Sequence, residues 1–106
     1  MTEITQADRK GIPYVLPTDY NLLGQVGRRV VRNEYTRLQD GKCYYCKGPL
    51  DEEPPQNIQK KPINWRRFPP NFLKYPHHLH HCHKTGMTIG TVHARCNAVL
   101  WQYHGE

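Results

Sequence analysis

The sequence predicts a small α+β domain that is stapled by a metal ion, with one helix ahead of a β-hairpin and a closing helix. Three observations favour this fold class. Only 37% of the 106 residues are hydrophobic, which is little material for a self-sufficient core. Two short-spaced pairs of possible metal ligands lie far apart in the chain. The last thirty residues follow the pattern of two strands and a helix.

Composition favours a metal ion over disulfides as the staple. The mean hydropathy is -0.85, and nine prolines and eight glycines add irregular backbone. The opening "MTEITQADRKG" has no apolar signal region, and no stretch reaches transmembrane length, so we expect a cytoplasmic chain without membrane contact. Stable disulfides are rare there. A secreted domain in which the four cysteines pair is the alternative.

Charge is distributed unevenly along the chain. The net charge is +6 and the pI is near 9.3. Residues 54–105 contain no Asp or Glu, but they contain seven basic residues: Lys60, Lys61, Arg66, Arg67, Lys74, Lys84 and Arg95. A solvated basic surface would explain this pattern, but an acid-free half chain favours a nucleic acid partner.

Residues 1–17 are expected to form an irregular arm, and residues 18–40 a helix. Thr18 or Asp19 can cap the helix, and Gly41 can end it. The expected apolar face is formed by Leu22, Val26, Val30 and Leu38, flanked by Leu23, Val31 and Tyr35.

The same helix carries several arginines. Arg28 and Arg32 are four residues apart and share a face, and Arg29 lies beside them. These side chains can contact phosphates, although an ordinary solvated face is an equal alternative.

A Cys-x-x-Cys turn within residues 41–49 follows the helix, and residues 50–76 form a proline-rich basic loop. Within that loop, "NWRRFPPNFLKYP" mixes aromatic and basic residues. Trp65, Phe68 and Phe72 can stack on bases, but a small satellite core is the favoured interpretation.

Residues 77–106 have the most regular pattern. "HHLHHCH" predicts a strand, "KTG" a turn, "MTIGTVHA" a second strand, and "ARCNAVLWQYHG" a closing helix. The expected domain therefore covers residues 18–106 and ends in a ββα unit.

Four residues in two pairs form a candidate zinc site. Cys43 and Cys46 make one pair, and His93 and Cys96 repeat the spacing. Structural zinc takes four such ligands in a tetrahedron, and the site would tie the first helix to the last. Cys82 has no short-spaced partner and is the poorer candidate ligand.

The histidines of "HHLHHCH" remain available for other chemistry. Imidazole is a base near neutral pH and also a metal ligand, and phosphodiester hydrolysis needs both functions. Residues 80 and 81 point to opposite faces of a regular strand, so this interpretation requires the strand to end or bulge near residue 81. A metal-sequestering or merely exposed histidine run is the alternative.

The segment "HLHHCHKTGMTIGTVHARCN", with "CYYC" upstream, resembles the HNH (ββα-metal, or His-Me finger) nucleases, most closely the recombination endonuclease VII family. The resemblance implies a zinc-stapled ββα-metal fold with a preceding helix. It implies structural zinc on Cys43, Cys46, His93 and Cys96. It also implies His81 as general base, His80 and Asn97 as ligands of a catalytic divalent cation, and His78 and His83 as accessory histidines at the phosphate.

The sequence departs from the family pattern at four positions, one of which is the expected zinc ligand His93 in place of the usual cysteine. His80 replaces an aspartate, Cys82 replaces a second one, and Leu100 stands where an acidic residue is usual. Without a carboxylate, magnesium should bind weakly, and manganese or nickel should be favoured in vitro. The chain ends at Glu106 without the long C-terminal part of junction-resolving members, which favours a compact nickase or general endonuclease.

The expected function is therefore metal-dependent DNA hydrolysis by an HNH endonuclease, expected to be a monomer. Phosphate contacts are assigned to Arg28, Arg29, Arg32, Arg66, Arg67, Lys74 and Arg95. Stand-alone proteins of this family and size are frequent in phages, where a larger partner can accompany them. The rival function is a non-catalytic, zinc-stapled DNA-binding or packaging-accessory module.

Overall fold

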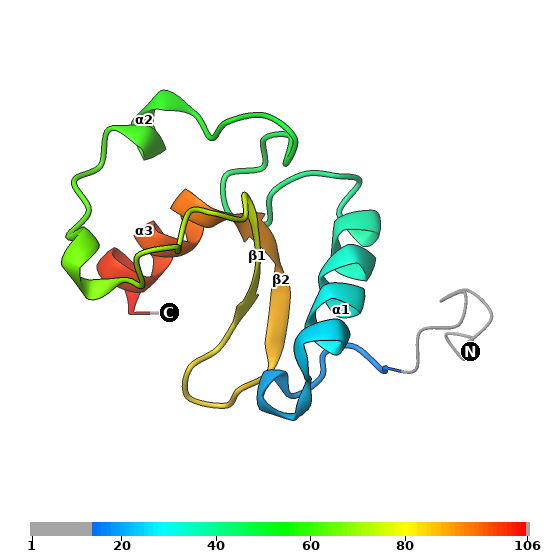
Figure 1. Ribbon diagram of the computed structural model, residues 1–106. Coiled ribbons are helices and arrows are strands. Elements are labelled where there is room, and N and C mark those ends of the chain that lie inside the picture. The colour runs from blue at the N-terminus through cyan, green and yellow to red at the C-terminus, as the bar shows by residue number, and fades with distance from the viewer. Residues whose placement is uncertain (1–13, 106) are drawn as a thin grey trace.

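The computed structural model describes residues 14–105. A two-stranded antiparallel sheet, β1 (His77–His81) and β2 (Thr88–His93), lies between two helices, α1 (Gln25–Leu38) and α3 (Ala94–His104) (Figure 1). The short helix α2 (Gln56–Gln59) belongs to the long connection that passes over α3. The predicted α+β class, with a hairpin followed directly by a helix, is confirmed at this level.

The hairpin contains the irregularity that the two histidine roles require. His80 pairs with Gly90, but His81 pairs with Thr88, so Ile89 is an extra residue on β2. β1 ends at His81, two residues earlier than the predicted strand, and the chain turns through Gly86 at φ 81°. The irregularity therefore lies on β2, opposite the step from His80 to His81, and β1 ends at this step.

The first helix begins later than predicted. The side chain of Asp19 accepts a hydrogen bond from the Asn21 amide and caps a separate 3-10 helix, Tyr20–Leu22. Thr18 pairs instead with Thr88 through two hydrogen bonds, which adds a short stretch of chain to the edge of β2. α1 then starts at Gln25 because the backbone is extended at Gly24.

The buried face of α1 also differs from the prediction. Leu22 and Val26 are 82% and 62% exposed, whereas Leu23 and Val31 are buried. The late start accounts for Leu22, which lies in the 3-10 helix. Within α1 itself, the buried face contains Gly27, Val31 and Glu34, one residue on from the predicted face. Gly27 shares the buried face and allows the hydroxyl of Tyr14 to approach closely.

The end of α1 agrees with the prediction. Asp40 adopts φ 56°, and the Gly41 amide donates back to the Thr36 carbonyl at 2.9 Å. This left-handed turn satisfies carbonyls at the end of the helix and directs the chain into the Cys-x-x-Cys segment.

The hydrophobic interior is divided into two small clusters. One packs α1 against β1 and contains Leu23, Val31 and Leu79. The other surrounds the cysteines under α3 and contains Cys43, Leu50, Ile58, Val92, Cys96, Val99 and Leu100. Two cysteines are thus among the most buried residues of a limited core. Within residues 14–105, no helix combines the length and the apolar character needed to cross a bilayer.

The Gln39 side chain makes hydrogen bonds to the edge of β2 that does not pair with β1, as the backbone of a neighbouring strand would. Its amide nitrogen donates to the Thr91 carbonyl at 2.9 Å, and its amide oxygen accepts from the Thr91 amide at 2.9 Å. We expect Gln39→Ala to lower the free energy of unfolding by about 1–3 kcal/mol, because it leaves the amide of the buried Thr91 without an acceptor, whereas the Thr91 carbonyl still accepts from the Tyr44 amide. Urea unfolding of the metal-loaded protein measures this loss. Gln25→Ala, at an exposed position of α1, is the control, and equal stability of both variants would contradict the prediction.

Candidate metal centre and histidine cavity

Four ligand residues from three segments meet under the start of α3. Cys43 and Cys46 lie in the turn after α1, His93 ends β2, and Cys96 lies in the first turn of α3. Their ligand atoms all lie within 4.8 Å of one another. The structure thus brings together the four residues that the spacing predicts, and Cys82 lies outside the cluster.

The distances fit a tetrahedral zinc ion. His93 Nδ1 is 3.5 Å from Cys46 Sγ and 3.6 Å from Cys96 Sγ. Zinc bonds of about 2.3 Å to sulfur and about 2.0–2.1 Å to nitrogen place tetrahedral S and N ligands about 3.5 Å apart. This donor set can therefore hold zinc without rearrangement of these three side chains.

The tautomer of His93 is also fixed for metal binding. Its Nε2 lies 2.9 Å from the Pro49 carbonyl and 2.8 Å from the Glu52 carbonyl. Both are acceptors, so the proton resides on Nε2 and the Nδ1 lone pair faces the cysteines. Such outer hydrogen bonds orient histidine ligands.

The pKa values of the three thiols favour the binding of a cation. The Cys96 thiol hydrogen bond, together with backbone amides including those of Tyr45 and Cys46, lowers the pKa of Cys43 to about 4, while burial opposes this shift. The pKa values of the other two thiols are raised, that of Cys46 chiefly by burial and that of Cys96 chiefly by its hydrogen bond to Cys43. One thiolate is thus favoured even without a metal, and a bound cation would replace the remaining thiol protons.

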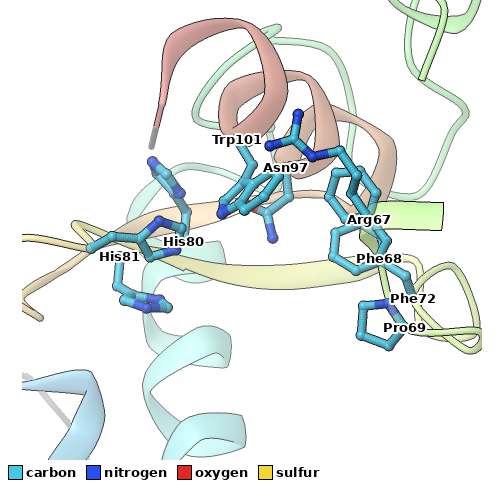
Figure 2. Close-up of a pocket in the computed structure, with 9 residues that line it drawn as sticks. Arg67, Phe68, Pro69, Phe72, His80, His81, Asn97 and Trp101 are labelled. Atoms are coloured by element: carbon cyan, nitrogen blue, oxygen red, sulfur yellow. The ribbon is translucent and has the colours of Figure 1, made fainter. Parts of the chain in front are cut away.

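A second group of side chains surrounds a cavity of about 280 Å³ between β1, α3 and the long connection. His80 and His81 come from β1, and Asn97 comes from α3 (Figure 2). Both histidines line this cavity at the end of β1, where the register with β2 shifts. His83 also lines it, so four of the five predicted catalytic residues share one cavity.

His81 is held in a stack of rings. Its imidazole lies parallel to the Tyr20 ring with centroids 3.8 Å apart, and His83 meets it edge-on at 4.9 Å. Burial lowers the pKa of His81, and the charges of His83, His80 and Arg28 add to this effect, while a hydrogen bond to the Leu79 backbone opposes it. The ring is therefore neutral at physiological pH, the form that accepts a proton.

His78 orients Asn97. His78 Nε2 lies 2.9 Å from the Phe72 carbonyl and carries the proton, so Nδ1 accepts from the Asn97 amide nitrogen at 3.1 Å. Burial lowers the pKa of His78 and keeps the ring neutral. Both ring nitrogens are therefore occupied, which favours a positioning role over the expected phosphate contact. The remaining polar atom of the Asn97 side chain is the amide oxygen, a hard ligand for a divalent cation.

His80 is only 1% exposed and lines the cavity beside Asn97. None of the described residues that line the cavity is acidic. Among residues 14–105, the cysteine–histidine cluster is the one set of three or more histidine, cysteine or carboxylate ligands close enough to share an ion. A cation at His80 and Asn97 would thus have two neutral protein ligands and would need others from water or a substrate.

A larger groove of about 1010 Å³ runs from α1 to the same site and shares Phe72, His81 and Asn97 with the smaller cavity. Arg28, Arg29 and Arg32 line it. The Arg28 guanidinium lies 4.0 Å from the centre of the Tyr20 ring, and in the described structure its buried Nε has no hydrogen-bond partner. An anion in the groove would supply one.

The other predicted phosphate ligands are dispersed. Arg67 lines the smaller cavity, whereas Arg66, Lys74 and Arg95 line neither space. Lys74 and Arg95 lie over the rings of Tyr75 and Trp65.

Sequence reasoning missed Tyr20 and Trp101 as residues of the site. Trp101 follows Asn97 by one helical turn, a spacing that could have indicated a shared face. No sequence signal connects Tyr20 to His81, because their contact depends on the pairing of residues 18–20 with the hairpin turn.

Comparison of the chain with family models, with curated proteins and with solved structures finds no match.

Proposed function

We propose that this protein is a metal-dependent DNA endonuclease of the HNH type, with zinc in the cysteine–histidine cluster. The observation that supports it best is the convergence of His80, His81 and Asn97 on one cavity that opens into a basic groove. A neutral base, two cation ligands and nearby arginines are the components that hydrolysis of a phosphodiester needs.

His81 acts as the general base. Its neutral imidazole takes a proton from water as the water oxygen attacks phosphorus, and the bond to the 3′-oxygen breaks. Tyr20 holds the plane of the ring, and His83 meets its edge within reach of the phosphate. His78 holds the Asn97 amide so that its oxygen is available in the cavity.

His80 and the amide oxygen of Asn97 would hold the catalytic cation. A divalent ion there would supply positive charge to the phosphate and to the leaving oxygen. Since both ligands are neutral, we expect manganese or nickel to bind more tightly than magnesium before DNA arrives.

Arg28, Arg29 and Arg32 would contact phosphates along the groove, and Arg67 would contact one beside the cavity. These contacts are independent of sequence and weaken with salt. Arg66, Lys74 and Arg95 remain candidates for outer contacts only, because they line neither space.

One observation favours a second function, a non-catalytic DNA-binding or packaging-accessory module with the same zinc cluster. Among the residues that the structure describes, no acidic side chain lines either space. A chain that only binds DNA needs no carboxylate at this place, whereas many enzymes that use magnesium hold it with one.

Nicking of supercoiled plasmid by zinc-loaded protein, scanned over magnesium, manganese and nickel, tests the proposal. We expect metal-dependent nicking or linearisation. In Asn97→Ala, we expect the ion concentration for half-maximal cleavage to rise at least about tenfold, because the variant loses a ligand.

Gln102→Ala is the matched control, since Gln102 lies on the same helix outside both spaces and bonds to the Pro62 carbonyl and the Asn64 amide. Retention of DNA without cleavage under any of the three metals would favour the binding module instead.

A further inference from the structure

The smaller cavity has a second wall that hydrolysis itself does not use. Phe68, Pro69 and Phe72 from the long connection and Trp101 from α3 face the histidines across the space (Figure 2). An aromatic wall beside a polar, basic one is the usual composition of a small-molecule site. Because this wall lies beside His81, any occupant would be adjacent to the phosphate that reacts in the proposed hydrolysis.

The wall is a packed cluster and keeps its shape. Phe68 and Phe72 have centroids 4.8 Å apart at 54°, and Phe68 meets Trp101 at 5.3 Å and 66°. Trp65 contacts both phenylalanines from outside the cavity. The satellite core expected from "NWRRFPPNFLKYP" is therefore present, and one side of it remains available to a ligand.

The charge of the cavity limits the class of occupant. No carboxylate of residues 14–105 lines it, and the Arg67 guanidinium lies over the Trp101 ring, 5.0 Å from the ring centre. Beside Arg67 and the divalent ion proposed at His80 and Asn97, a positively charged ring is disfavoured, and a flat uncharged ring carried on an anionic backbone is favoured. The cavity volume of about 280 Å³ lies just below the range of about 300–1,000 Å³ that is typical of pockets for drug-sized ligands, so the cavity suits one ring system.

We propose, on the basis of the nuclease function proposed above, that this cavity receives one unpaired nucleobase next to the scissile phosphate. A base that is stacked in a duplex cannot enter a cavity, so the substrate class is DNA that is unpaired at the cleavage position, such as a bulge or a single-stranded segment. Aromatic walls accept any of the four bases, because every base has a π face. The cavity would therefore distinguish unpaired from paired DNA and would not distinguish one sequence from another.

Binding without added divalent ion separates this inference from catalysis. The probes are a matched duplex, the same duplex with a one-nucleotide bulge, and the bulged duplex with an abasic site at that nucleotide. We expect the full zinc-loaded chain to bind the bulge about 5- to 150-fold more tightly than its abasic form, the range that aromatic stacking of one base supplies. A 2-aminopurine at the bulge should change its fluorescence on binding.

Two variants test the wall, since one of them can perturb packing. Trp101→Ala removes the ring from α3, and Phe68→Leu keeps apolar volume but removes an aromatic face. Both should abolish the difference between the bulge and its abasic form, whereas Trp65→Ala, which keeps the ring contacts that line the cavity, should retain it.

Equal affinity of the wild-type chain for the base-containing and abasic bulges would overturn the inference, as would a difference that persists in both wall variants. The failure of the nuclease proposal has a different signature. A chain that never cleaves plasmid but prefers the base-containing bulge supports the base cavity alone, and a chain that cleaves without this preference retains the nuclease alone.

Discussion

Removal of zinc is expected to unfold this protein. The core consists of two small clusters, and the larger one is built around Cys43 and Cys96 themselves. Structural zinc contributes about 10–16 kcal/mol of apparent binding free energy in small zinc domains. The whole stability of a typical domain is about 5–15 kcal/mol. A zinc ion bound at the cluster would therefore supply a contribution as large as the total, and the chain without it should lose cooperative structure.

Far-ultraviolet circular dichroism during chelator titration, with zinc content measured in parallel, checks this expectation. Wild-type protein should hold one zinc ion per chain, unfold as it is removed, and refold when zinc is restored. Cys43→Ser and Cys96→Ser should lose both metal and fold. Cys82→Ser is the matched control, because Cys82 lies outside the cluster and should keep both. An unchanged melting temperature in zinc-free protein would contradict the prediction.

The four residues of the cysteine–histidine cluster were predictable from sequence because each pair is local. A Cys-x-x-Cys or His-x-x-Cys spacing brings two ligands together in any tight turn or helix start, whatever the rest of the chain does. Only the meeting of the two pairs depends on the fold, and a limited core makes that meeting the simplest source of stability. The structure places all four ligand atoms within 4.8 Å of one another.

The start of α1 was not predictable by the same reasoning. Asp19 and Leu22 carry ordinary helix signals, but residues 18–20 pair with the turn between β1 and β2. That pairing satisfies the backbone of Thr18 and Tyr20 outside a helix, and it outweighs the local propensity. The apolar face was misplaced because Val30 and Val31 lie on adjacent faces of the helix, and only the packing of α1 against the sheet decides which face is buried.

The histidine cavity was only partly predictable from sequence, unlike the cysteine–histidine cluster, which was predictable, and the start of α1, which was not. Sequence indicated that His80 and His81 need a bulge to act together, and the register shift lies between them. The residues that complete the site are contributed by distant segments. Tyr20 reaches His81 from the N-terminal side, and Phe68 and Phe72 arrive from a proline-rich connection without a regular period. Such contacts depend on tertiary packing, which a single sequence does not encode in any local pattern.

Replacement of the proposed base gives the largest expected loss of activity. His81→Ala should reduce plasmid cleavage by about 10²–10⁴-fold, the usual contribution of a general base, while zinc content and DNA affinity stay unchanged. The ring is only half-buried and belongs to neither hydrophobic cluster, so its removal should leave the fold intact. His104→Ala is the matched control, because His104 contacts Tyr45 at the end of α3 and lines neither space.

The space that His81→Ala leaves provides a second readout. Truncation opens a slot between the Tyr20 ring and His83, which normally lie parallel and edge-on to the imidazole. Added imidazole should enter this slot and restore part of the cleavage, because it supplies the missing proton acceptor in a stacked position. If imidazole rescues the His81→Ala variant but not the double variant that also carries Tyr20→Ala, stacking on Tyr20 positions the base. Full activity of His81→Ala without imidazole would contradict its assignment as the base.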